Sequence, residues 1–264
     1  MSLLIYAESA EGKFKKVAFE LASYAKKVAE SLGTTVTAVT INASDVSELS
    51  KYGVDKVLKV TNDKLTAFNA KAYADTIKQA AQKEGAKVIV LSSTTDSIYL
   101  APLVAVGLEA GYTSNVVGLP LSTSPFQVKR NAFSNKAFNT TEISTEIKVL
   151  GLAKNSYGLV ESDSSLSTED FLPNLNDTDF NVKVESVEKV TGKVTIADAE
   201  VVVSGGRGLK GPENWGMVEE LATVLGAATA CSKPVSDLGW RPHSEHVGQT
   251  GKPVATNLYI AIGI

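Results

Sequence analysis

Residues 201–215 read VVVSGGRGLKGPENW, and this stretch decides the fold of the C-terminal part of the chain. The valine run Val201–Val203 is typical of a buried strand in a parallel sheet. The strand ends in a glycine-rich turn that carries Arg207, and we expect a helix after Pro212. A second loop between glycines, VGQTG at 247–251, precedes another apolar strand. Polar loops at the ends of neighbouring strands are what an open α/β sheet uses to hold a nucleotide-like cofactor.

Composition narrows the class of protein. The chain has 264 residues, of which 44% are hydrophobic, so it can bury the core of one large domain or two ordinary ones. A net charge of −3 speaks against a nucleic-acid binder. The single cysteine, Cys231, excludes an internal disulfide and a cysteine-rich metal site. No apolar run has membrane-spanning length and no leader precedes the first strand, so we expect a cytoplasmic protein without membrane insertion.

The first hundred residues alternate between strand and helix patterns. Apolar runs predict strands, and apolar residues at helical spacing predict helices between them. The predicted strands are Leu3–Tyr6, Val36–Ile41, Lys56–Val60 and Lys87–Leu91, and the predicted helices are Phe14–Leu32, Val46–Tyr52, Thr66–Gln82 and Ala101–Ala110. This order implies a Rossmann-like parallel sheet with helices on its faces.

The pattern changes in the middle of the chain. Val116–Leu152 alternates and carries turn signals, which indicates three or four antiparallel or mixed strands added to the sheet. A polar, serine-rich stretch then ends in a predicted strand at Phe180–Val187, and Lys189–Asp198 is interpreted as a connection between domains. We therefore predict an N-terminal α/β domain at 1–190 and a second, partial α/β domain at 191–264.

Three motifs carry a specific resemblance. The segments SGGRGLKGPENW (204–215), GWRPHSEHVGQTGK (239–252) and LYIAIGI (258–264) resemble the α subunit of electron-transfer flavoprotein. The likeness runs through the whole C-terminal part, while the N-terminal part resembles the family through its order of elements. It implies that the C-terminal domain binds FAD.

The resemblance also implies roles for individual residues. Arg207 matches an arginine beside the isoalloxazine ring, where a positive charge favours the negatively charged reduced forms of a flavin. Ser232 matches a serine that binds the phosphate-bearing part of FAD, and Lys233 stands where the family has arginine. The residues that match the loop contacting the ring are Val247, Gly248, Gln249 and Thr250, with the threonine hydroxyl at flavin N5.

Two simpler interpretations of these loops stay open from the residues alone. The turn at 204–208 can be a tight strand-to-helix connection with an exposed arginine, and the loop at 247–251 can be a polar surface hairpin. In the cofactor-binding interpretation, by contrast, glycines at 205, 206 and 208 permit positive φ and let backbone amides approach a ligand. There is no G-x-G-x-x-G pattern here, so an ordinary dinucleotide fingerprint does not apply.

Partners follow from the same resemblance. It implies a heterodimer with an electron-transfer flavoprotein β subunit, electrons arriving from acyl-CoA dehydrogenases or related flavin dehydrogenases, and a quinone reductase or similar acceptor. Such a protein is an electron carrier rather than a substrate-converting enzyme, and no acid–base constellation is visible. The alternatives are an NAD(P)- or FAD-binding oxidoreductase domain with its own substrate, and an interaction subunit of the same fold without flavin.

The last strand, Leu258–Ile264, is followed by no covering helix, which a buried parallel strand normally has. The resembling family continues into a further FAD-binding loop. We therefore expect a truncated chain that holds FAD weakly and exposes an apolar face.

The remaining polar residues favour structural roles. His243 and His246 lie next to Pro242, which predicts an irregular loop rather than a helical metal pair. Cys231 lies among small apolar residues, which indicates a buried thiol. The first strand–helix loop has no phosphate-binding glycines and carries Glu8 and Glu11, which would repel a bound phosphate. The N-terminal domain is therefore expected to serve as a scaffold and partner surface.

Overall fold

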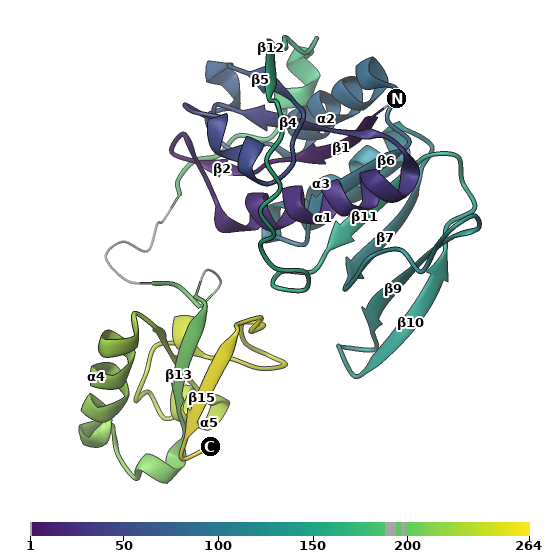
Figure 1. The fold of residues 1–264 in the computed structure, drawn as a ribbon. Coiled ribbons are helices and arrows are strands. Elements are labelled where there is room, and N and C mark those ends of the chain that lie inside the picture. The colour runs from purple at the N-terminus through teal and green to yellow at the C-terminus, as the bar shows by residue number, and fades with distance from the viewer. Residues whose placement is uncertain (1, 188–193, 197–198) are drawn as a thin grey trace. The chain divides into compact units, whose positions relative to one another are not determined.

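A large, mostly parallel sheet organises the N-terminal part of the protein (Figure 1). The computed structural model describes residues 2–187, 194–196 and 199–264. It divides into two compact units, Met1–Glu185 and Ser186–Ile264, and each is described by itself. The division expected at residue 190, and most of the predicted connection, lie outside the described residues.

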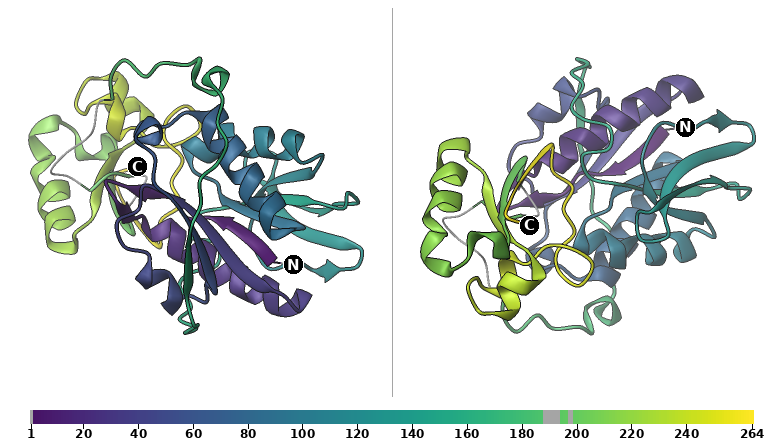
Figure 2. Two further views of the ribbon diagram at one scale, coloured as in Figure 1. Left: turned by 90° about the horizontal axis from the view of Figure 1, so that it is seen from above. Right: turned by 90° about the horizontal axis from the view of Figure 1, so that it is seen from below.

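The sheet of the first unit has the strand order β10-β9-β7-β11-β6-β1-β4-β5-β12, with β8 paired to β9. Its parallel centre consists of β5 (Lys56–Val60), β4 (Thr35–Ile41), β1 (Ser2–Tyr6), β6 (Val88–Ser92) and β11 (Lys148–Leu152). Helix α1 (Lys16–Leu32) packs on one face, and α2 (Ala70–Glu84) and α3 (Thr95–Gly107) pack on the other (Figure 2). The predicted Rossmann-like parallel sheet is confirmed.

Side chains of the central strands alternate between two hydrophobic cores. In β1, Leu3 and Ile5 pack with the α1 side, whereas Leu4 and Tyr6 pack with the side of α2 and α3. All four are buried, which explains why this strand reads as a continuous apolar run rather than as an alternating one.

The added strands are mixed, as expected. They are β7 (Gly111–Val116), β8 (Ser122–Thr123), β9 (Phe126–Ala132) and β10 (Ala137–Glu142), and β11 returns to the parallel sheet. β9 and β10 form an antiparallel ribbon, and β7 pairs with β11 in parallel. At the other edge, the polar strand β12 (Ser167–Asp170) runs parallel to β5, although no strand was predicted there.

Besides the helix predicted over Val46–Tyr52, which is a 3-10 helix at Ser47–Lys51, two predicted elements need correction. Helix α3 begins at Thr95, six residues before the predicted start, because the Thr94 side chain accepts a hydrogen bond from the backbone N–H of Ser97 and caps the first turn. The predicted strand at Phe180–Val187 is wrong: a short 3-10 helix occupies Asp177–Phe180, and residues 181–187 form no strand.

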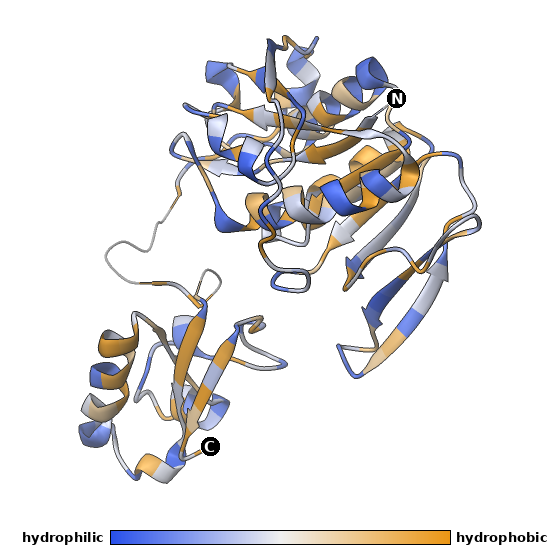
Figure 3. Cartoon of the chain, viewed as in Figure 1, coloured by the Kyte–Doolittle hydropathy of each residue, from blue (hydrophilic) through white to orange (hydrophobic). Residues whose placement is uncertain are grey.

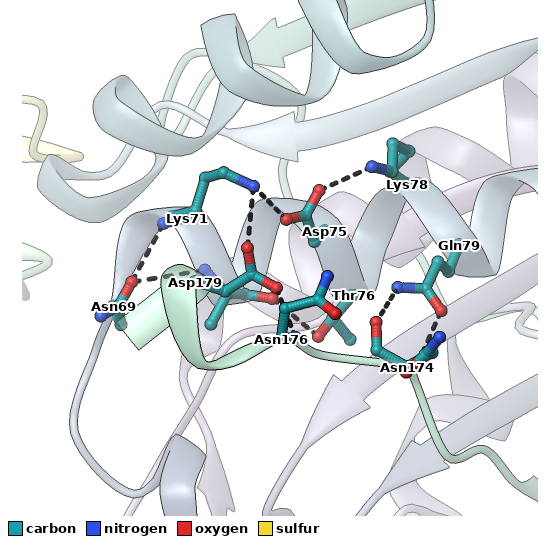
Figure 4. Close-up of polar contacts among 10 residues, drawn as sticks. Asn69, Lys71, Asp75, Thr76, Lys78, Gln79, Asn174, Asn176 and Asp179 are labelled. Carbon is teal, nitrogen blue, oxygen red and sulfur yellow. Dashed lines mark hydrogen bonds and ion pairs between the residues drawn. The ribbon is translucent and has the colours of Figure 1, made fainter. Parts of the chain in front are cut away.

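The reason for the second correction is a set of side-chain bonds to α2 (Figure 4). Lys71 Nζ donates to Asp179 Oδ1 at 3.0 Å. Gln79 and Asn174 exchange two hydrogen bonds of 2.8 Å between the glutamine side chain and the asparagine backbone. Together with the bond from Asn69 Nδ2 to Val182 O, these polar contacts hold residues 174–182 across the helix, and the backbone of these residues pairs with no strand among the described residues.

The second unit contains a three-stranded parallel sheet with the order β14-β13-β15. The strands are β14 (Ala228–Cys231), β13 (Val201–Gly205) and β15 (Leu258–Ile262), and the helices are α4 (Gly216–Leu225) and α5 (Lys233–Asp237). The strands β13 and β15 are mostly hydrophobic, whereas α4 carries both hydrophobic and hydrophilic residues (Figure 3). Val203, Trp215, Val218 and Val235 form the core between the sheet and both helices.

Candidate functional site

The carboxyl ends of the three strands in the second unit are tied together by backbone hydrogen bonds. The N–H of Gly206 donates to Ile262 O at 2.9 Å, and the N–H of Gly208 donates to Gly263 O at 2.8 Å. On the other side of β13, the N–H of Ser232 donates to Gly205 O at 3.1 Å. The loop that follows β13 is therefore anchored to both neighbouring strands.

The glycines of this loop are required by packing, which corrects the role expected for them. A Cβ atom on Gly206 would lie 2.2 Å from Gly263 O, and one on Gly208 would lie 2.7 Å from Gly263 Cα. A Cβ on Gly205 would meet the Trp215 ring at 2.5 Å. None of the three glycines has a positive φ. The N–H groups of Gly206 and Gly208 already have partners on the chain, so they are not free to bind a ligand.

Arg207 lies at the turn of this anchored loop, in a 3-10 helix over Arg207–Leu209. The residue is exposed. Its guanidinium makes no hydrogen bond, ion pair or ring contact with any residue in the described ranges 2–187, 194–196 and 199–264. A fixed positive charge therefore stands at the carboxyl end of the central strand, held by a rigid backbone and available to an anionic or electron-rich ligand.

The second predicted loop begins beside the end of β14. The N–H of Val247 donates to Cys231 O at 3.1 Å, which places Val247 next to the strand end that Ser232 follows. The loop closes on itself, because Gly248 N–H donates to Lys252 O at 3.2 Å. Gly248 has φ of 119°, a value that a side chain would strain.

The tip of this loop offers polar groups to solvent. Gly248, Gln249 and Thr250 are exposed. The side chains of Gln249 and Thr250 have no hydrogen-bond partner within the part of the chain that the structure describes. The six residues predicted for the site thus come from three adjacent segments: one follows β13, one follows β14, and one runs beside β14.

An arginine that the sequence analysis missed supports this region. Arg241 makes a bidentate contact with Glu245, at 2.8 Å from Nε and 2.7 Å from NH2, and its NH1 lies 2.9 Å from Glu219 Oε1 in α4. The guanidinium also lies 5.3 Å from the centre of the Trp215 ring. Hydrogen bonding to Glu245 raises the pKa of Arg241 above the ordinary value of an arginine side chain. Arg241 therefore fastens the turn before the second loop to α4 and to the tryptophan that packs on Gly205.

The other polar residues singled out in the sequence lie just behind the loop. Where an irregular loop was predicted, a short 3-10 helix occupies His243–Glu245 after Pro242; His246 follows it, and the two imidazole ring centres lie 5.2 Å apart. His246 is buried, and its Nδ1 has no partner among the described residues. Cys231 is fully buried, and burial raises the pKa of its thiol to about 11. The expected buried structural thiol is confirmed.

Comparison with known proteins adds to this geometry. The family model described as electron transfer flavoprotein domain matches residues 3–170, and the one described as electron transfer flavoprotein FAD-binding domain matches residues 195–264. The chain belongs to the electron transfer flavoprotein alpha-subunit family. The interval between the two matches, residues 171–194, contains the division between the two structural units at residues 185 and 186.

Relatives of this family cover nearly the whole chain. The electron transfer flavoprotein subunit alpha of Thermoanaerobacterium thermosaccharolyticum is 32% identical over 98% of this chain and 81% of its own length. That of Syntrophomonas wolfei is 33% identical over 98% of this chain and 82% of its own length. The acryloyl-CoA reductase electron transfer subunit beta of Anaerotignum propionicum is 28% identical over 98% of this chain and 81% of its own length.

Family membership defines the chain as an electron-transfer flavoprotein subunit, and the cofactor of this family is a flavin. The residues predicted from the motifs lie in the second unit, inside the segment that the FAD-binding model matches. Among the described residues, no helix combines the length and the apolar character needed to cross a membrane.

Proposed function

We propose that the chain is the FAD-binding α subunit of a heterodimeric electron-transfer flavoprotein. In this proposal it carries electrons from acyl-CoA dehydrogenases or related flavoenzymes to a quinone reductase or similar acceptor. The observation that carries it is the arrangement in the second unit. Arg207, Ser232 and the loop 247–250 come from segments that meet at the carboxyl end of one parallel sheet, where such sheets bind nucleotide-like cofactors.

In this proposal, each residue of the site makes a different contact with FAD. When bound, FAD supplies the electron-transfer chemistry. The unpaired guanidinium of Arg207 places a positive charge beside the ring system, and the exposed hydroxyl of Thr250 can donate to or accept from a ring nitrogen. The side-chain amide of Gln249 can also donate and accept hydrogen bonds. The backbone of Val247 and Gly248 sets the position of the loop against β14.

The phosphate contact is the weakest part of this arrangement. Ser232 immediately precedes the first turn of α5, and its side chain makes no capping hydrogen bond to that helix, so its hydroxyl can donate to a phosphate. Lys233, in place of the family's arginine, donates to Asp237 at 2.6 Å. Because this carboxylate partly offsets its charge, we infer that Lys233 contributes less to phosphate binding than a bidentate arginine would.

The first unit would then act as the scaffold and as the surface that binds the β subunit. After its polar first turn, helix α3 is apolar on all sides, and its outward side chains Ile98, Tyr99, Leu103 and Val106 are between 41% and 80% exposed. A helix that is apolar on all sides is normally buried, and an exposed apolar patch marks an interaction site. We infer that the β subunit covers this face of α3.

Co-expression with a β subunit tests the proposal. We expect a stable heterodimer that contains FAD, identified by chromatography after denaturation. Val106→Glu should reduce recovery of the β subunit, whereas Val224→Glu, at an exposed position of α4 in the other unit, should leave it unchanged. A complex without flavin, or one that contains a different flavin, would contradict the assignment of FAD.

A further inference from the structure

A buried carboxylate that the flavin site does not use lies in the first unit. Strand β1 is flanked by β4 on one side and β6 on the other. The chain builds β4 and β5 on one side before it crosses to β6 and β11 on the other, so the topological switch point lies between β1 and β6. In open α/β sheets this is the position where ligands bind, with phosphates at the N-terminus of a following helix.

Glu8 occupies this position. It follows the end of β1, is only 3% exposed, and points to the first turn of α3, the helix that follows β6. Its Oε1 accepts hydrogen bonds from Thr94 Oγ1 at 2.6 Å and from Ser97 Oγ at 3.0 Å. Lys15 Nζ lies 3.7 Å from the other carboxylate oxygen. Hydroxyls at a helix N-terminus and a nearby lysine are the groups that would otherwise bind a phosphate.

We propose that the Glu8 side chain is a built-in anion that fills the phosphate position of the N-terminal sheet. The sheet keeps the topology of a nucleotide-binding domain, but its own carboxylate uses the donors that a nucleotide would need. A second anion there would face the Glu8 charge and would find Thr94 and Ser97 already paired. The first unit therefore serves as a scaffold, independently of which flavin the second unit binds.

Replacement of the carboxylate by a free anion tests this inference. In Glu8→Ala the donors lose their partner, so added acetate should bind there and raise the thermal unfolding midpoint of the first unit. At acetate concentrations about ten times the dissociation constant, the rise should be about 3 to 6 °C relative to sodium chloride of equal ionic strength. Wild type, and Glu48→Ala at an exposed carboxylate of the same unit, should show no such rise.

Further controls address an unfolded Glu8→Ala variant and the binding of a nucleotide by wild type. If Glu8→Ala is unfolded in chloride, acetate should restore its folding. The variant Glu8→Gln keeps the shape of the side chain and should not respond to acetate. In wild type, AMP should give no hydrogen-exchange protection at residues 94–98. Equal responses of Glu8→Ala and Glu48→Ala to acetate, or protection of residues 94–98 by AMP in wild type, would overturn the inference.

Discussion

The backbone N–H of Gly208 donates a 2.8 Å hydrogen bond to the carbonyl oxygen of Gly263. This bond joins the loop after β13 to the residue after β15, although the two are far apart in sequence. Together with the bond from Gly206 to Ile262, it fixes the backbone on both sides of Arg207. The position of the Arg207 backbone is therefore set by the sheet and does not depend on a flexible loop.

Gly206→Ala should destabilise the second unit. The added Cβ would lie 2.2 Å from Gly263 O and 2.6 Å from Ile264 Cα, so the two backbones would have to separate. Overpacking of this kind costs about 1 to 3 kcal/mol. Gly216→Ala is the matched control, because a Cβ there meets nothing within 4 Å. Urea denaturation of both variants measures the difference, and equal stability would show that the loop does not depend on this contact.

The segment across α2 should depend on Asp179. This carboxylate is 4% exposed and accepts bonds from Lys71 Nζ and from the backbone N–H of Asn176. Asp179→Ala should cost about 1 to 3 kcal/mol and speed proteolysis of residues 171–182. Asp177 pairs with Lys64 at 3.6 Å but is fully exposed, so Asp177→Ala should change stability by less than about 0.5 kcal/mol. Identical proteolysis of the two variants would contradict this account.

Glu8 should give the first unit a specific pH dependence. Burial raises its pKa above the ordinary 4.5, although Thr94, Lys15 and Ser97 lower it and Asp96 raises it slightly. The folded protein therefore binds this proton more tightly than the unfolded chain does. The associated stability is present below pH 4.5 and is lost as the pH rises through the raised pKa.

Comparison with Glu8→Gln isolates this contribution. We expect the unfolding free energy of wild type, relative to the variant, to fall as the pH rises from 4.5 through the raised pKa. Chemical denaturation at several pH values measures it. A difference that stays constant with pH would show that the buried carboxyl group is not shifted.

The sequence predicted the central sheet because its strands are buried on both faces and read as apolar runs. The start of α3 was missed because this helix is apolar all round, so its sequence has no amphipathic period that marks a first turn. The strand β12 was missed because Ser167–Asp170 is polar and becomes a strand only by pairing with β5. Tertiary contacts decide such edge elements.

The candidate flavin site was also only partly predictable from the sequence. The motifs located Arg207, Ser232 and the loop 247–250, and the structure brings their segments to one end of a sheet. The motifs did not identify Arg241, because its role rests on contacts with Glu219, far away in sequence, as well as with Glu245. The functions of the glycines near Arg207 were also not readable, since the atoms that crowd them belong to Gly263 and Trp215.

The charge of Arg207 is the central element of the proposed flavin site. A unit charge about 4 Å from the ring, at an effective dielectric constant of about 20, contributes at most about 4 kcal/mol. For a one-electron step this corresponds to an upper limit of about 170 mV. Arg207 is exposed, so solvent should reduce the effect to some tens of millivolts.

Potentiometric titration of the FAD-loaded heterodimer is the most direct test. Arg207→Ala should lower the potential of the first reduction step by some tens of millivolts, and Arg207→Lys should lie between the variant and wild type. If the arginine only completes a turn, Arg207→Ala would lose stability with an unchanged potential. A potential in folded, FAD-loaded Arg207→Ala equal to that of wild type would contradict the placement of this charge beside the flavin.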